Sequence, residues 1–377
     1  MKHVAFVTAY PVHGNHGMLS VNIAARDIIN RIAPEWTCTY FCIETDYSLC
    51  FPHFGGFHYE QLVAPESQLK NYDIVFFWGD FLQCETYLLD VANRLQKREQ
   101  TTYQKALDRC FKCLLFENTS PELLQKTVLF GGSTFPNAGY KAPKSDRYKN
   151  AARNLLASSL LVMPRDVFTY DYFASLVPYR AKNGDLTPSL DPAFFLDSNL
   201  ACSQPPKKDH ILIALSRSFA SKGFVLKRKH ANSSRIINYL SNVFQLPTRK
   251  SGWRTNPWNV EHFEHTLAEL QDAKFVITDT YHCAINSWLR GTPAVLLTER
   301  HASFSSPTSS LKLILLANSI NATPFLLTLS RKAKTNIEAA HAIHLALKTD
   351  APYDTLDTII AKKDHAIEKL YNVCVNK

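Results

Sequence analysis

The amino-acid sequence predicts an α/β protein with two doubly wound domains, each a parallel sheet between layers of helices. Short apolar runs such as Val4–Thr8 are typical of buried parallel strands, and each is followed by a loop and an amphipathic stretch. A segment rich in Ser, Pro and Lys at residues 198–209 indicates a linker between two series of such units. The length of 377 residues suits two domains, at about 100–200 residues for each domain.

We therefore expect a first domain at residues 1–200 and a second at residues 207–350. A final helix is expected at about residues 353–373, packed back on the first domain. Residues 84–126 have a helical pattern but carry no motif, so the sequence assigns them no role.

Composition indicates a globular protein with buried cores, since 46% of the residues are hydrophobic and 20% are charged. No apolar run approaches the ~20 residues that cross a bilayer, and the first residues enter a strand without a secretory leader pattern. The nine cysteines are scattered and odd in number, which favours reduced thiols. Cys110 and Cys113 form a lone pair without a second pair at zinc spacing, so we expect no metal site. These features predict a cytoplasmic protein.

The net charge of +9 is concentrated in one segment. Residues 207–254 contain eleven Lys or Arg and a single acid, a local balance of +10, so the rest of the chain sums to about −1. Such a segment indicates an acidic ligand, a nucleic acid or an anionic membrane surface, or else a solvated face. It contains no recognisable nucleic-acid-binding module, so we expect no nucleic-acid partner.

The most informative stretch is residues 275–297, which has the pattern of a strand, a helix and a second strand. Its first helical turn carries Thr280, Tyr281 and His282, and the helix ends at Gly291. A helix N-terminus that follows a parallel strand favours an anion, so His282 would stand beside a phosphate or carboxylate site. The alternative is an ordinary α/β unit whose histidine only caps a helix.

Two loops of the first domain also carry candidate residues. The loop before the first helix contains Asn15 and Gly17, but its spacing matches neither the dinucleotide-binding nor the P-loop pattern. Asp80 follows a buried strand within a Gly-Asp pair, where it could act as a base or accept from a sugar hydroxyl. Its alternative role is that of a helix N-cap.

Further along the first domain, a Gly-rich loop carries the hydroxyls of Ser133 and Thr134, which can donate to a phosphate. Small residues in such loops would let the backbone approach a ligand. Arg165 ends the next apolar run, and its planar guanidinium suits a carboxylate or phosphate; the alternative is a surface ion pair with Asp166. Asp191 precedes a proline and is interpreted as a turn residue.

These landmarks, near residues 14, 79, 131, 165, 191 and 282, resemble those of the polysaccharide pyruvyl transferase family in order and spacing. The resemblance covers most of the chain and is specific on its own only at residues 275–297. The residues of that stretch that match the family pattern are Asp279, His282, Gly291, Thr292 and Pro293. The chain departs from the pattern at Thr280, where many members have arginine, at Cys283, where glycine is usual, and at Met18, where an acid is usual.

The resemblance implies a GT-B-like arrangement, with two Rossmann-like domains facing across a cleft. It also implies transfer of pyruvate from phosphoenolpyruvate to a saccharide, with no cofactor beyond this donor substrate and no metal. His282 would be the acid and Asp80 the base. The donor-binding candidates are Arg165, Arg217, Thr280, Tyr281, Ser133, Thr134 and Asn15.

The acceptor is expected to be a saccharide or lipid-linked saccharide, with Lys222, Lys227 and Arg228 as candidates to bind it. Peripheral contact with the inner face of a membrane through residues 207–254 would fit such an acceptor. Two alternatives stay open. The first is a glycosyltransferase of the same fold that uses a nucleotide sugar, because Thr280 removes one expected cation. The second is a non-catalytic saccharide-binding protein.

Overall fold

The computed structural model describes residues 2–9, 16–44, 57, 59–134, 145–197, 207–215, 224–253, 260–299, 309–330 and 332–375. For residues 224–232 it describes the helical backbone without the side chains. The chain divides into two compact units. Unit 1 comprises residues 1–12, 21–196 and 362–377, and unit 2 comprises residues 13–20 and 197–361.

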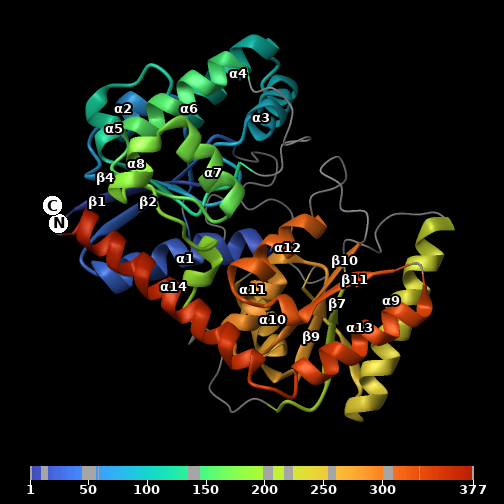
Figure 1. Cartoon of the computed structure of the whole chain (residues 1–377). Coiled ribbons are helices and arrows are strands. Elements are labelled where there is room, and N and C mark those ends of the chain that lie inside the picture. The colour runs from blue at the N-terminus through green and yellow to red at the C-terminus, as the bar shows by residue number, and fades with distance from the viewer. Residues whose placement is uncertain are drawn as a thin grey trace. The chain divides into compact units, whose positions relative to one another are not determined.

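The strands of unit 1 described here form a six-stranded parallel sheet of order β3-β2-β1-β4-β5-β6 (Figure 1). These strands are β1 (His3–Val7), β2 (Thr37–Cys42), β3 (Tyr59–Gln61), β4 (Ile74–Trp78), β5 (Thr127–Phe130) and β6 (Leu161–Met163). The order reverses direction between β1 and β4, which is the switch point at which doubly wound sheets bind ligands.

Helices cover both faces of this sheet. Figure 1 shows α1 (His16–Ile32) and the C-terminal part of α14 (Ala351–Cys374) along one face. The other face carries α3 (Glu85–Arg98), α4 (Tyr103–Leu114), α5 (Pro121–Gln125) and α6 (Asp146–Ser158). The remaining helices of unit 1 are α2 (Pro65–Leu69), α7 (Val167–Leu176), α8 (Pro178–Asn183) and the short 3-10 helix η2 (Pro192–Phe195). Residues 84–126 are therefore mainly α3, α4 and α5.

An aromatic stack holds the centre of unit 1 together. Phe6 stacks on Phe76 with ring centroids 5.1 Å apart, and Trp78 stacks on Phe130 at 4.7 Å. All four rings are fully buried. Trp78 also donates from Nε1 to the carbonyl of Val21 at 2.8 Å, which fastens α1 to the end of β4. The strand ends that carry the candidate residues are thus anchored in the core.

Unit 2 is a second parallel sheet, with the order β11-β10-β9-β7-β8 among its described strands. These are β7 (Ile211–Ala214), β8 (Thr248–Lys250), β9 (Phe275–Thr278), β10 (Ala294–Glu299) and β11 (Leu326–Leu329). Figure 1 shows α9 (Phe224–Phe244) and α13 (Ala333–Ala346) on one face of the sheet. The other face carries α10 (Val260–Asp272), α11 (Tyr281–Leu289) and α12 (Ser309–Ser319). The switch point lies between β7 and β9.

The core of unit 2 explains why its central strands β7 and β9 are mainly apolar. Ile236 and Leu240 of α9 and Ile343 of α13 pack against Ile277 of β9 and Leu327 of β11. Helices cover both faces of the parallel sheet, so the central strands meet protein on either side. The predicted fold class, two doubly wound Rossmann-like domains of the GT-B-like kind, is confirmed.

The glycines at the ends of β4 and β5 both lie against Pro192 of η2, and an approach of this backbone to a ligand stays a prediction. A methyl group on Gly131 would lie 2.4 Å from Pro192 Cδ, and one on Gly79 would lie 2.9 Å from Pro192 Cγ. The small residues are needed because the Asp191-Pro192 turn packs onto this edge of the sheet.

We predict that Gly131→Ala destabilises unit 1 more than Gly184→Ala. Both glycines have a positive φ, +66° and +78°, so alanine costs about 1–2 kcal/mol at either position. At Gly184 the nearest atom to the added methyl is Lys369 Nζ at 3.8 Å, an ordinary contact. At Gly131 the overlap with Pro192 should add about 1–3 kcal/mol. Urea unfolding of both variants measures the difference, and equal losses would show that the Pro192 contact is not tight.

Candidate functional site

The carboxyl end of β9 is held in place by one buried side chain. Thr278 Oγ1 donates to the carbonyl of Ala214 at the end of β7 at 2.9 Å, and it accepts the backbone N–H of Thr280 at 3.0 Å. The same hydroxyl therefore ties β9 to β7 and shapes the turn into α11. As a result, the first turn of α11 begins at the switch point of unit 2.

His282 lies in that first turn, and its ring rests directly against the backbone of Gly17. A methyl group on Gly17 would lie 2.3 Å from His282 Nδ1 and 2.7 Å from its Cγ, closer than real atoms approach. Residues 13–20 cluster with unit 2, so this is a contact within that unit. Gly17 is itself in the first turn of α1. The first turns of two helices therefore meet at the imidazole of His282.

The first turn of α1 is anchored in unit 2 by His16. This side chain is 2% exposed, and its ring meets Trp253 edge-on with centroids 5.8 Å apart and Phe263 of α10 at 5.6 Å. Burial lowers the pKa of His16 from 6.5 to about 4, with a further lowering by His262 and an opposing hydrogen bond to the Trp253 backbone. The ring is thus neutral near pH 7.

The residues around His282 are packed rather than open. The Thr280 hydroxyl donates to Asp279 Oδ1 at 3.2 Å, and Thr280 is the N-cap of α11 without a side-chain bond to its first turn. The Tyr281 ring meets the His282 ring edge-on at 5.2 Å. Cys283, where glycine was expected, is fully buried, and burial raises the pKa of its thiol to about 12. The thiol is therefore protonated at neutral pH and suited to packing.

Asp80 lies at the switch point of unit 1, directly after β4. Its backbone has a φ of +50°, which is uncommon for a residue with a side chain, and it follows Gly79 with a φ of +73°. The Asp80 carbonyl accepts the backbone N–H of Ser133 at 2.8 Å, so the ends of β4 and β5 hold this conformation. The side chain is half-buried. Backbone strain of this kind is often found at functional sites.

Arg165 forms a buried ion pair with Asp191, and not the surface pair with Asp166 that was its alternative. The guanidinium Nη1 donates to Asp191 Oδ2, and the side chains are 6% and 0% exposed. The Arg165 guanidinium also lies 4.9 Å from the centroid of the Phe81 ring. Asp191 in turn accepts the backbone N–H of Ala193 at 2.9 Å, which confirms its interpretation as a turn residue. A donor-binding role for Arg165 stays a prediction.

The hydroxyls of Ser133 and Thr134 are engaged with α7. Ser133 Oγ donates to Asp166 Oδ2 at 2.6 Å, and Asp166 caps α7 by accepting the backbone N–H of Thr169 at 2.8 Å. Thr134 meets the hydroxyl of Thr169 through both its backbone N–H, at 2.9 Å, and its own hydroxyl, at 3.3 Å. These contacts connect the loop after β5 to the helix after β6. Donation to a phosphate by either hydroxyl stays a prediction.

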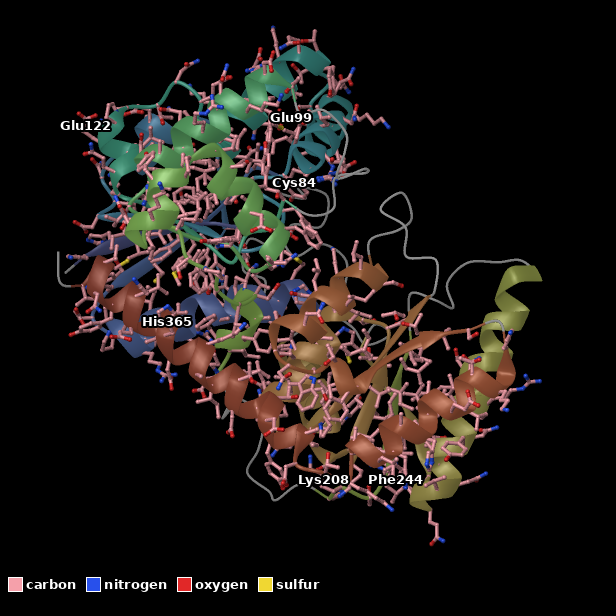
Figure 2. All side chains as sticks on the ribbon, viewed as in Figure 1. Cys84, Glu99, Glu122, Lys208, Phe244 and His365 are labelled. Carbon is pink, nitrogen blue, oxygen red and sulfur yellow. The ribbon has the colours of Figure 1, made fainter. Side chains whose placement is uncertain are left out.

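The described part of the basic segment includes Lys208, Arg249 and Lys250. Lys208 lies at the amino edge, where its Nζ donates to Thr292 Oγ1 at 2.6 Å just before β10 begins (Figure 2). Burial lowers the Lys208 pKa to about 8. Arg249 and Lys250 are exposed on the short edge strand β8. Charge on an edge strand discourages pairing with other chains, which is a sufficient structural reason for those two residues.

Several candidates fall beyond what the structure describes. Asn15, Arg217 and Lys222 lie outside the described residues. Lys227 and Arg228 are on α9, but their side chains are not among those described. The roles of all five stay predictions.

Two residues of the site escaped the sequence analysis. His16 precedes Gly17 in a loop that was judged by its glycine spacing alone, and Trp253 follows the edge strand β8. The sequence signal that could have identified Trp253 is a bulky aromatic residue shortly after a strand, at the edge where ligands bind in such sheets. Among the described residues, no group of three or more His, Cys, Asp or Glu could hold a metal ion. Within the same part of the chain, no helix is long and apolar enough to span a membrane.

Two parallel-sheet units place this chain among the α/β proteins of Rossmann-like build, in which ligands generally bind at a switch point. A sequence model of the family described as polysaccharide pyruvyl transferase matches residues 21–301. The chain belongs to this family, and it is therefore a transferase by family. No curated protein matches it.

Solved structures show a similar course of the chain at low identity. A functionally uncharacterized protein from Klebsiella pneumoniae is 15% identical, with a TM-score of 0.41 and coverage of 87% of this chain and 93% of that chain. UDP-GlcNAc 2-epimerase from Methanocaldococcus jannaschii is 9% identical, with a TM-score of 0.46 and coverage of 90% and 92%. An Arabidopsis thaliana protein crystallised with UDP-L-rhamnose is 11% identical, with a TM-score of 0.47 and 99% coverage of both chains.

We predict that Arg165→Met lowers the free energy of unfolding by about 3–5 kcal/mol, because it leaves the Asp191 carboxylate buried without its cation. Asp191→Asn in the same chain should recover much of this loss, because the amide is neutral and can still cap η2. Arg153→Met, at an exposed position of α6, is the control and should cost under about 0.5 kcal/mol. Urea unfolding of the wild type and the three variants tests this. If Arg165→Met keeps its stability but loses affinity for phosphoenolpyruvate, the arginine is a ligand residue instead.

We predict that His16 contributes to acid sensitivity. Its folded-state pKa of about 4 lies below the ordinary value of 6.5, so the unfolded chain binds the proton more readily. The stability that this provides is complete above pH 6.5 and is lost as the pH falls towards 4. Between pH 7 and pH 5 the loss should be about 2 kcal/mol. His16→Phe should remove this part of the pH dependence, and His265→Gln, at an exposed position of α10, should retain it. Identical slopes for wild type and His16→Phe would contradict the prediction.

Proposed function

We propose that the protein transfers a pyruvyl group from phosphoenolpyruvate to two neighbouring hydroxyls of a saccharide, forming a cyclic ketal. The enol carbon C2 forms two C–O bonds to the acceptor and loses its C–O bond to phosphate. One hydroxyl proton goes to the methylene carbon, which becomes a methyl group, and the other leaves with the phosphate. No oxidant, reductant or metal is needed to balance this reaction.

The observation that carries this proposal is the meeting of the first turns of α1 and α11 at His282. Each helix N-terminus carries a partial positive charge and favours an anionic group. Phosphoenolpyruvate has two such groups, a carboxylate and a phosphate. A substrate with two anionic ends therefore suits a site with two helix termini, and membership of the pyruvyl transferase family supports the same donor.

In this proposal His282 supplies the proton to the methylene carbon. An imidazole can hold and deliver a proton near neutral pH, and protonation of that carbon makes C2 open to attack by a hydroxyl. Asp80 is proposed as the base that accepts protons from the acceptor hydroxyls, because of its place at the switch point of unit 1. A saccharide, free or lipid-linked, is the proposed partner.

A nucleotide sugar is the second candidate donor, and one observation favours it. Thr280 replaces the arginine that many family members carry, and its hydroxyl is bonded to Asp279. Residue 280 therefore supplies no positive charge for phosphoenolpyruvate, a small donor that carries up to three negative charges. A nucleotide sugar would take its affinity from a larger contact area and would depend less on that charge.

The test is a thermal melt of the wild-type protein with phosphoenolpyruvate, with UDP-GlcNAc, and with inorganic phosphate as a control. A donor at ~100 times its Kd should stabilise the protein by about 2.7 kcal/mol, a shift of several degrees. We expect a shift with phosphoenolpyruvate that exceeds the shift with phosphate. A shift with UDP-GlcNAc alone would overturn the proposal in favour of a glycosyltransferase.

We predict that His282→Gln keeps the phosphoenolpyruvate shift but lowers kcat for ketal formation by about 10²–10⁴-fold, because an amide can donate a hydrogen bond but cannot deliver a proton. Single-turnover ketal formation with saturating donor measures this. Asn93→Ala, at an exposed position of α3 outside both switch points, is the control and should turn over like wild type. Turnover by His282→Gln near the wild-type rate would exclude His282 as the acid.

A further inference from the structure

Gly17 differs from the other described glycines in what it approaches. Its φ is not positive, so an L-residue would fit the backbone there without strain. In a helix, alanine is ordinarily favoured over glycine by about 1 kcal/mol, so the backbone alone gives no reason for glycine at this position. What excludes a side chain is the imidazole of His282, whose Nδ1, Cγ and Cβ would lie 2.3, 2.7 and 2.8 Å from an added methyl group.

These three distances also define the orientation of the ring. The atoms nearest to Gly17 are on the Nδ1 edge of the imidazole, so the Nε2 edge is turned away from the first turn of α1. The third short distance is to Cβ, which does not move when the ring turns about the Cβ–Cγ bond. A methyl group on Gly17 therefore cannot be accommodated by a turn of the ring alone, and either α1 or α11 must shift.

The first turn of α1, against which the His282 ring packs, is held in place by hydrogen bonding and aromatic packing. Ser20 Oγ donates to the Gly17 carbonyl at 2.8 Å, which closes the turn, and both residues are buried in unit 2. His16, one residue earlier, is packed between Trp253 and Phe263. On the other side, Asn286 Nδ2 donates to the His282 carbonyl at 2.8 Å, which holds the first turn of α11. The His282 ring thus lies at the first turns of α1 and α11, and both turns are held by hydrogen bonds.

We propose that Gly17 is a positioning residue for His282: its bare α-carbon lies against the Nδ1 edge of the imidazole and thereby fixes where Nε2 stands. This inference rests on the proposed function in that it gives His282 a part in the chemistry. Gly17 presents no side chain to donor or acceptor in this scheme. It acts only by fixing where the proton-bearing nitrogen stands, and a misplacement of about 1 Å can cost ~10²-fold in rate.

The test compares Gly17→Ala in the wild-type chain and in a His282→Gly chain, because alanine at position 282 would keep the Cβ atom that lies 2.8 Å from the added methyl group. In the wild-type chain the methyl group displaces the imidazole, so kcat for ketal formation should fall about 10²-fold while the KM for phosphoenolpyruvate changes much less. In the His282→Gly chain the obstacle is absent, so Gly17→Ala should raise the melting temperature, as alanine does in a helix. A fall in melting temperature in both chains would overturn the proposal, because the glycine would then serve α1 alone.

A spectroscopic readout separates this inference from the proposed function. The imidazole Cε1–H signal of His282 can be assigned in a proton–carbon NMR spectrum by its loss in His282→Gln. We expect Gly17→Ala to move this signal and to leave the signals of the exposed histidines, such as His265, in place. An unmoved His282 signal would overturn the positioning role. If the signal moves but phosphoenolpyruvate neither binds nor reacts, Gly17 positions His282 and only the proposed function fails.

Discussion

The bonds of the Thr278 hydroxyl are the constraint on which the candidate site depends. The hydroxyl donates to the carbonyl at the end of β7 and accepts the N–H of the turn into α11. The start of the helix is therefore fixed relative to the paired strands at the switch point. His282 is then placed by the helix, and Gly17 is the residue that can lie against it. Loss of the hydroxyl would leave a buried carbonyl and a buried N–H without partners, which is costly in a protein interior. The position of His282 therefore depends on the hydrogen bonds that Thr278 makes at the end of the sheet.

The two units use the carboxyl edges of their sheets differently. In unit 1 the ends of β4 and β5 are covered by Pro192, and the ion pair of Arg165 with Asp191 is buried beside them. What this edge offers to a ligand is its switch point, where Asp80 follows β4. In unit 2 the switch point carries the start of α11 itself. The same sheet architecture thus carries a packed proline turn beside Asp80 in one unit and a helix terminus in the other.

Buried polar groups account for much of the order at these edges. Asp166, Asp191 and Thr278 each make at least two hydrogen bonds to loops that are distant in sequence or to the helix that follows. Such groups must be satisfied in one geometry, so they select a single arrangement of the loops. The neutral His16 ring differs from these groups, since it packs against aromatic rings and its burial disfavours protonation.

The sequence alone determined the fold class, the position of His282 at a helix start, and the turn chemistry of Asp191. Each of these depends on the periodicity of a short segment or on neighbours in the chain, which a sequence displays directly. The tertiary structure decided which loops share a switch point, because strand order is set by packing between distant segments. It paired Arg165 with Asp191 instead of its neighbour Asp166, directed the glycines of unit 1 towards Pro192, and brought Gly17 against His282 across 265 residues of sequence. No local sequence pattern contains those contacts, because each joins two segments of the chain that meet only in the folded sheets.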